Sequence, residues 1–195
     1  MRKIIEDDVD LEGVLSKIHL TELFDLSDVE VTGYFDCRRN KLTSLKGAPH
    51  TVGTYFSCSY NNLTSLKGAP RNVIGGRVTG GFFCSYNNLT SLEGAPRTVG
   101  GKFFCTNNFL TSLKGAPKTV GGVFDCRYNK LTSLEGAPKT VGNNFICYNN
   151  PLTSLEGIPK VVGRNFFISK ELENKFPQEY IRSLCEIKGE VIYIF

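Results

Sequence analysis

The chain lacks the features that mark a membrane protein or a secreted protein. No apolar run approaches the roughly 18 residues that a membrane span requires. The first residues turn acidic where a secretory signal would need an apolar stretch. We therefore expect a cytoplasmic protein without membrane contact.

Catalytic and metal-binding patterns are also missing. Histidine is scarce, with His19 and His50 about 30 residues apart and outside any motif, and no glycine-rich motif opens a helix to hold phosphate. Cysteine is more common, but seven is an odd number, and six of the seven recur at one position of a repeat, which argues against a disulfide framework. Thiols in a line do not offer zinc its tetrahedron of ligands. We expect no enzymatic activity, cofactor or metal, and cysteines that fill the core.

What the chain has in abundance is one motif, F-x-C-x-x-N-x-L-T-S-L-x-G-x-P, which occurs six times. Its cysteines recur every 21 residues, apart from one interval of 26, and an asparagine follows each cysteine three residues later. A fixed period of this length predicts a solenoid, because each unit can bury its apolar face only against its neighbours. The cysteines are Cys37, Cys58, Cys84, Cys105, Cys126 and Cys147, and the asparagines are Asn40, Asn61, Asn87, Asn108, Asn129 and Asn150.

Within one copy, the alternation of Phe35 and Cys37 with polar residues predicts a short strand whose phenylalanine and cysteine point inward. Asn40 should turn the chain and bond the backbone of its own turn and of the next coil. Leu42 and Leu45 should fill the core beyond that turn. Gly-Ala-Pro then bends the chain back towards the next strand.

This pattern resembles the leucine-rich repeat, which reads L-x-x-L-x-L-x-x-N/C-x-L. In this chain Phe takes the fourth position, Cys the sixth and Asn the ninth, and two leucines follow. The wording L-T-S-L-x-G-A-P-x-x-V-G is also similar to repeat proteins of tailed phages and some bacteria. The resemblance implies a leucine-rich-repeat solenoid of the α/β horseshoe class, mostly β, with a parallel sheet on the concave face. Since no helix-length segment lies between Leu45 and Val52, we expect an irregular or extended convex side.

The chain divides into an N-terminal cap (residues 1–30), a repeat region (31–169, six full copies and a degenerate seventh) and a C-terminal cap (170–195). The C-terminal cap should contain a helical turn at 170–176, then a helix that begins near Pro177 and ends at Gly189. The β-prone tail after it should seal the last coil or pair with a second copy. An insertion at residues 71–77 should bulge out on the convex side, as a functional loop or as a tolerated one.

Outward positions of the predicted strand vary between copies, and several carry large apolar groups where polar ones would suit water. Exposed aromatic groups with arginine are typical of binding surfaces, although the rings could instead cover one another. We therefore predict partner contact through one set of residues on the concave face. They are Phe83, Phe104, Ile146, Phe167, Tyr60, Tyr86, Tyr128, Tyr148, Asp36, Arg38, Asp125 and Arg127.

Charge is distributed unevenly: residues 1–30 carry three basic and nine acidic groups, whereas residues 31–169 carry sixteen basic and five acidic. Each of the six full repeat copies has a basic residue directly after its proline. We call this set the basic ridge: His50, Arg71, Arg97, Lys118, Lys139 and Lys160. The favoured prediction is a non-enzymatic protein that holds a protein partner. The phage-like wording implies an inhibitor or modulator of a host protein, in the host cytoplasm if phage-encoded. Alternatives are nucleic-acid binding through the basic body and self-assembly through the tail.

Overall fold

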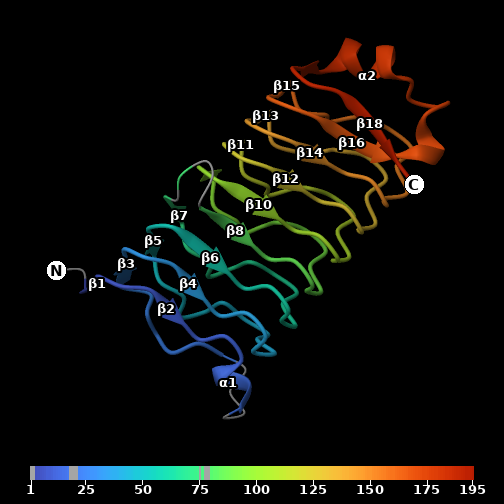
Figure 1. Cartoon of the computed structure of the whole chain (residues 1–195). Coiled ribbons are helices and arrows are strands. Elements are labelled where there is room, and N and C mark those ends of the chain that lie inside the picture. The colour runs from blue at the N-terminus through green and yellow to red at the C-terminus, as the bar shows by residue number, and fades with distance from the viewer. Residues whose placement is uncertain (1–2, 18–21, 75, 77–79) are drawn as a thin grey trace.

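The computed structural model describes residues 3–17, 22–74, 76 and 80–195; His19 and part of the 71–77 insertion lie outside these ranges. The described residues form a parallel β-solenoid of about eight turns with a spacing of about 21 residues (Figure 1). Each coil adds one strand to each of two sheets. The predicted stack of repeats is therefore confirmed.

Both sheets are parallel and, in the described chain, contain nine strands each. Sheet A is ordered β1 (Lys3–Ile5), β3 (Val29–Val31), β5 (Thr51–Val52), β7 (Asn72–Val73), β9 (Thr98–Val99), β11 (Thr119–Val120), β13 (Thr140–Val141), β15 (Val161–Val162) and β17 (Glu186–Ile187). Sheet B is ordered β2 (Val9–Asp10), β4 (Phe35–Asp36), β6 (Tyr55–Ser57), β8 (Gly81–Phe83), β10 (Lys102–Phe104), β12 (Phe124–Asp125), β14 (Phe145–Ile146), β16 (Phe166–Ser169) and β18 (Val191–Ile194).

Of the two expectations for the convex side, irregular or extended, sheet A shows that the chain there is extended. A Thr-Val or Val-Val pair that follows the turn forms a two-residue strand of its own, and these strands hydrogen-bond from coil to coil. Two stacked parallel sheets are the arrangement of a β-helix rather than of a leucine-rich-repeat horseshoe.

The core is a set of stacked identical side chains. Phe35 and Cys37 and their equivalents point inward from sheet B, as predicted, and Val52 and its equivalents point inward from sheet A. Successive phenylalanine rings stack with centroids 5.3–5.8 Å apart from Phe35 to Phe166. Each stacked pair contributes about 0.5–1.5 kcal/mol beyond area burial, so the ring column ties every coil to the next.

The asparagines form the predicted ladder, but it links each coil to the preceding one. The side-chain amide of Asn108 donates to the carbonyl oxygen of Cys105 in its own turn (3.2 Å) and to that of Cys84 in the previous coil (3.1 Å). Its side-chain oxygen accepts from the backbone N–H of Leu89, also in the previous coil (3.0 Å). The buried amide is therefore satisfied by backbone alone.

Glycine sets the two tight corners of each coil. In the Gly-Ala-Pro turns, glycine φ lies between 86° and 99°, a region that side chains with a Cβ rarely adopt. At the corner between the two sheets, a Cβ on Gly142 would overlap the carbonyl oxygen of Gly121. Gly121 in turn sits against Gly100, so this corner repeats its close backbone approach from coil to coil.

Both predicted caps contribute strands to the sheets. At the N-terminus, β1 pairs with β3 and β2 pairs with β4, so residues 3–10 form part of a coil. The four-residue helix α1 (Val14–Lys17) follows, and Leu15 is fully buried. The N-terminal segment thus covers the first core layer while it continues both sheets.

The C-terminal cap replaces the usual turn by helices. The predicted turn at 170–176 is the 3₁₀ helix η1 (Lys170–Leu172), and α2 (Gln178–Leu184) follows Pro177. The predicted helix end at Gly189 is wrong, because Glu186 and Ile187 leave the helix to pair with β15. Ile181 and Cys185 are buried as expected, whereas Tyr180 and Leu184 are exposed.

The tail forms β18, which pairs in parallel with β16 over four residues and seals the last coil in the way the sequence favoured. Tyr193 fixes it further by donating from its hydroxyl to the carbonyl oxygen of Phe176 (2.7 Å). Only Phe195 at the very end is almost fully exposed, at 97%.

Helices in the described part of the chain are short, and none has the length and apolarity that crossing a membrane requires.

Candidate binding face on the outer side of sheet B

The residues predicted to contact a partner lie together on the outer side of sheet B, in three columns that run across the coils. Strand register places each residue of the first column beside the next, as for Ser57 beside Phe83 and Phe83 beside Phe104. The first column is Asp36, Ser57, Phe83, Phe104, Asp125, Ile146 and Phe167. The second is Arg38, Ser59, Ser85, Thr106, Arg127, Tyr148 and Ser169. The third is Arg39, Tyr60, Tyr86, Asn107, Tyr128, Asn149 and Lys170.

The phenylalanines of the first column are half-buried rather than exposed. Phe83 meets Phe104 edge to face, with centroids 5.3 Å apart, and meets Tyr55 in the same way at 5.8 Å. Ile146 and Phe167 are also half-buried. The rings thus partly cover one another, which was the alternative reading, but each keeps part of its surface towards solvent.

The two acidic residues of this column are buried beneath their arginines. Asp36 and Asp125 are 2% and 3% exposed, and each carboxylate contacts the arginine two residues on, with Nε–Oδ2 distances of 3.1 Å. Each also accepts the backbone N–H of that arginine, at 3.0 and 3.2 Å. The aspartates therefore hold Arg38 and Arg127 in place and offer a partner little surface themselves.

Burial outweighs the arginines in the titration of these carboxyls. Loss of hydration raises the pKa of Asp125 to about 6, although the charge of Arg127 opposes the shift. The pKa of Asp36 is raised for the same reason. A charged Asp125 is thus held in the folded chain at a cost.

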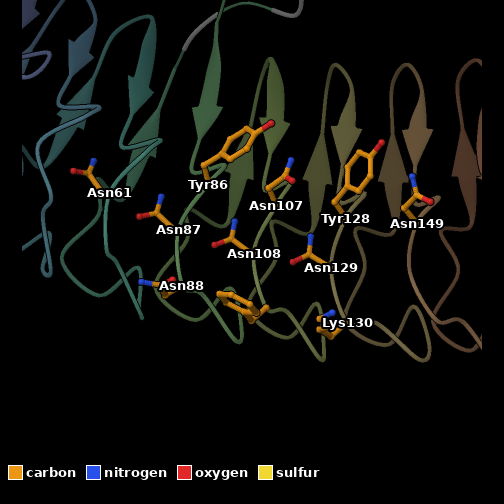
Figure 2. Close-up of a pocket in the computed structure, with 11 residues that line it drawn as sticks. Asn61, Tyr86, Asn87, Asn88, Asn107, Asn108, Tyr128, Asn129, Lys130 and Asn149 are labelled. Atoms are coloured by element: carbon orange, nitrogen blue, oxygen red, sulfur yellow. The ribbon is translucent and has the colours of Figure 1, made fainter.

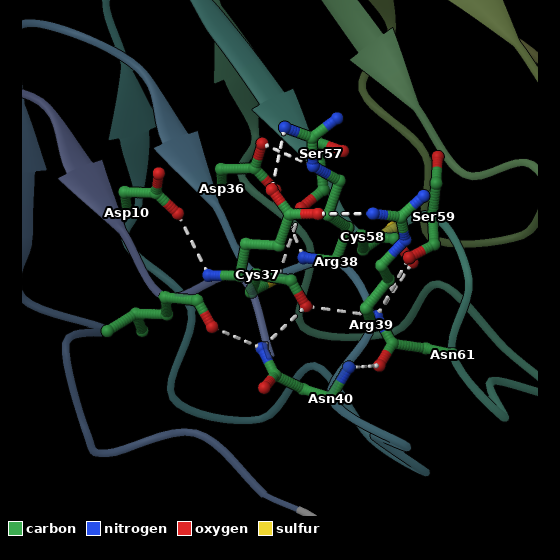
Figure 3. Close-up of polar contacts among 12 residues, drawn as sticks. Asp10, Asp36, Cys37, Arg38, Arg39, Asn40, Ser57, Cys58, Ser59 and Asn61 are labelled. Carbon is green, nitrogen blue, oxygen red and sulfur yellow. Dashed lines mark hydrogen bonds and ion pairs between the residues drawn. The ribbon is translucent and has the colours of Figure 1, made fainter. Parts of the chain in front are cut away.

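At the N-terminal end of the face, Glu12 closes over the arginines. Its carboxylate contacts Arg38 at 2.9 Å and Arg39 at 2.8 Å, so three side chains from two coils form one ion-pair cluster (Figure 3). Arg38 is consequently less available to a partner than the sequence implied. The guanidinium of Arg39 also lies over the ring of Tyr60, 5.2 Å from its centroid.

The third column has an unusual backbone. Its members in the repeats all have φ near +55°, the left-handed region, although none is glycine. Asparagine tolerates this conformation, and Asn107 and Asn149 occupy it, but a bulky residue there is an outlier. Tyr60, Tyr86 and Tyr128 nevertheless occupy it with 45–48% of their surface exposed. These tyrosines are as exposed as predicted, and their conformation is strained.

Small residues leave a hollow between the first arginine and the phenylalanines. Ser57, Ser59 and Ser85 form its floor, while Tyr55, Phe83 and Phe104 stand around it. Its volume of about 410 Å³ lies within the range of ligand-sized pockets. A partner's side chain could enter here without displacing any part of the core.

A second groove follows the turn edge of the third column (Figure 2). Tyr86, Asn107 and Tyr128 stand in a row along it, and Lys130 lies on its other side. Phe109 also lines the groove. The sequence reasoning did not include Phe109, which is 52% exposed. The sequence did contain a signal for Phe109: an aromatic residue stands there at a position where the other coils have lysine, asparagine or proline. Tyr55 was also missed, because it directly precedes the inward Phe56 and so lies outside the three columns.

The cysteines are all free thiols in the described chain, and all are buried. Burial raises the pKa of each thiol in the ladder well above its usual value and that of Cys185 to about 11. Several also donate to a carbonyl of the next coil, as Cys37 does to Ser57 at 3.2 Å. Across the described residues, no three His, Cys, Asp or Glu side chains cluster closely enough to hold a metal ion.

The basic ridge lies on the sheet A side, directly before the strands of that sheet. Backbone bonds connect Lys118 to Arg97, Lys139 to Lys118 and Lys160 to Lys139, so the residues follow one another coil by coil. All except His50 are exposed, and none forms an ion pair within the described residues. The basic ridge and the aromatic columns of sheet B therefore lie on different sides of the solenoid.

No protein-family model matches the chain, and neither does a curated protein or a solved structure.

Proposed function

We propose that the chain is a non-enzymatic binding protein that holds a protein partner against the outer face of sheet B. The observation that carries this proposal is the contrast between its two outer faces. Between Glu30 and Glu186, towards its two ends, sheet A carries small, repetitive residues at its outward positions, mostly threonine, of which Thr51 alone is buried: Thr51, Asn72, Thr98, Thr119, Thr140 and Val161. Sheet B presents phenylalanine, tyrosine, arginine and serine in an order that changes from coil to coil.

The demands of folding do not account for that contrast. Both sheets belong to the same coils, have the same parallel pairing and need the same hydrogen bonds. Small polar residues on sheet A satisfy those demands, so they would serve sheet B as well. Varied aromatic residues beside arginine are instead the composition of interface anchors.

Backbone strain in the third column supports the same conclusion. Asparagine stands in this column at two coils and suits φ near +55° better than tyrosine does. Three coils retain an exposed tyrosine there, and exposure gives the ring little role in the core. A strained backbone conformation whose side chain contributes little to the stability of the core is typical of functional sites.

The leucine-rich-repeat resemblance points to the same sheet, because sheet B carries the F-x-C strand that such a protein would place on its binding face. The phage-like wording of the repeat extends the proposal to an inhibitor or modulator of a host protein. The net positive charge of the repeat region fits an acidic partner.

A second candidate is nucleic-acid binding through the basic ridge. Five exposed cations in consecutive coils, without acidic partners in the described chain, favour it. We place it second because the aromatic residues that would stack bases lie on the other sheet.

The decisive test compares capture of a partner from host lysate by wild-type protein and by two variants. Phe104→Ala should reduce capture at least about tenfold, because Phe104 lies near the centre of the face where truncation is most costly. Its half-burial against Phe83 means that stability should fall as well, by about 1 kcal/mol. A melt at the assay temperature therefore has to show that the variant is folded.

The matched variant neutralises the ridge, with Lys118→Gln and Lys139→Gln on the opposite sheet. Capture should survive these changes if sheet B is the interface. The reverse pattern would move the interface to the ridge: capture that tolerates Phe104→Ala, disappears with the lysines and falls steeply with salt.

A further inference from the structure

The third column contains a gap that is one ring wide. Tyr60 and Tyr86 come from neighbouring coils and stack almost in parallel, with centroids 4.4 Å apart and planes 8° apart. The next coil places the short side chain of Asn107 at this position, and the coil after it returns to tyrosine at Tyr128 (Figure 2). We call the space above Asn107, between Tyr86 and Tyr128, the slot.

The spacing of the coils fixes the width of the slot. Adjacent strands of a parallel sheet lie about 4.8 Å apart, so two steps separate the backbones at Tyr86 and Tyr128 by about 9.6 Å. A flat ring needs about 3.5–4 Å to the atoms on each of its faces. The slot therefore has room for one ring and not for two. Tyr60 covers one face of Tyr86, so the other face of Tyr86 points towards the slot.

The chain itself shows which groups suit a face of this column. A phenol stacks on Tyr60 from one side, and the guanidinium of Arg39 lies over it from the other. The rest of the groove is lined by the amides of Asn88 and Asn149 and by Lys130, which lies on the side opposite the tyrosines. Lys130 is exposed and forms no ion pair within the described residues, so it disfavours a guanidinium and favours an aromatic ring with a carboxylate nearby.

We propose that the slot binds an aromatic side chain from an acidic segment of the partner. The incoming ring takes the place that a tyrosine at position 107 would occupy, and an adjacent carboxylate of the segment pairs with Lys130. This inference rests on the proposed function, in that the segment belongs to a protein held on sheet B. It adds the chemistry that this part of the face recognises.

A tryptophan peptide can test the slot without background, because the chain has no tryptophan. The probe is acetyl-Gly-Glu-Trp-Glu-Gly-amide, followed by its fluorescence during titration with protein. Wild-type protein should give a saturable shift in tryptophan emission. The same peptide with leucine in place of tryptophan should not compete, since it offers no ring to stack.

Asn107→Tyr fills the slot with the chain's own ring and should weaken peptide binding at least about tenfold. The substitution is tolerable because tyrosine already occupies this backbone conformation in three coils. Lys41→Tyr is the matched control: its φ is 58°, against 53° at Asn107, and Lys41 does not line the groove, so the variant leaves the slot open. It should bind the peptide as wild type does.

The outcomes separate this inference from the proposed function. The slot is wrong if Asn107→Tyr binds the peptide as tightly as wild type, if leucine competes equally, or if wild-type protein gives no saturable shift. Partner capture then decides the broader proposal. If Phe104→Ala abolishes capture and Asn107→Tyr does not, the partner binds sheet B but does not use the slot. Capture that is insensitive to both variants contradicts both ideas.

Discussion

At the scale of single residues, the asparagine ladder shows how a polar group can be essential to a core. Each side chain bonds only to backbone, and it replaces hydrogen bonds that the tight turn cannot make for itself. No other side chain of this size both donates and accepts in that geometry. The ladder is therefore a structural device, distinct from the variable columns of the outer face.

Replacing one member of the ladder should be costly. Asn108→Ala removes an amide bonded to three carbonyl oxygens and leaves the N–H of Leu89 without its acceptor. We expect the free energy of unfolding, measured by denaturant titration, to fall by about 1–3 kcal/mol. Asn62→Ala, at an exposed site, should change it by less than about 0.5 kcal/mol. Equal effects at both sites would show that water satisfies the turn.

Asp125 should make stability depend on pH in an unusual direction. Because folding raises its pKa to about 6, the folded state binds the proton more tightly than the unfolded state does. The free energy of unfolding should therefore fall as pH rises from about 4 to about 6, by on the order of 2 kcal/mol. Asp125→Asn cannot titrate, so its curve over this range should be flatter. Parallel curves for the two proteins would contradict the assignment.

At the scale of elements, the corner between the sheets depends on the absence of a side chain. Gly142→Ala places a methyl group against the backbone of Gly121, which cannot move without disturbing the coil below. Overpacking of this kind costs about 1–3 kcal/mol, and thermal denaturation should show a clear loss. Thr119→Ala, an exposed change on the neighbouring strand, should leave the midpoint almost unchanged. A silent Gly142→Ala would mean that the corner can open.

The elements also show what the sequence could predict. The F-x-C strand, the Asn ladder and the leucines were predictable because each repeats with a side-chain pattern that only a stacked coil explains. Sheet A was not, because a strand of two residues, such as Thr140–Val141, is too short to show alternation. The strands β2 and β18 at the two ends of sheet B could not be predicted for a different reason. Val9 and Val191 take the place of phenylalanine there, so the first and last coils do not carry the motif.

Within the binding face, the sequence located the columns but not the exposure of their members. Period two fixes which strand residues point outward, and that was enough to place Phe83 and Phe104 on one surface. It does not say that Asp125 lies beneath Arg127, because that depends on the path of a long side chain. The strain of the tyrosines was likewise invisible, since it is a property of the turn.

At the scale of the whole molecule, stability is shared between neighbours. Each coil contacts only the coils beside it, so unfolding can begin at an end or at a weak coil and spread. The region around the 26-residue interval interrupts the regular spacing and is one place where this could start. The cysteine ladder offers a probe at every coil.

Thiol titration should therefore count few reactive groups in the native protein. All seven cysteines are buried and their raised pKa values suppress the reactive thiolate. We expect at most one fast-reacting thiol in native protein and all seven in denaturant. Mass spectrometry after partial labelling should show whether thiols are released together or coil by coil. Several fast groups without denaturant would contradict a closed core.

The uniform coil has one more consequence. Because the 21-residue coils share one motif and join their neighbours through the same ring and asparagine contacts, inserting or removing a whole copy should leave the core intact. It changes only the distance between groups on the surface, such as Arg38 and Arg127. Each added or removed copy changes the length of the solenoid by one coil. The spacing of two binding residues can therefore be matched to the spacing of their two contact sites on a partner by the number of copies between them.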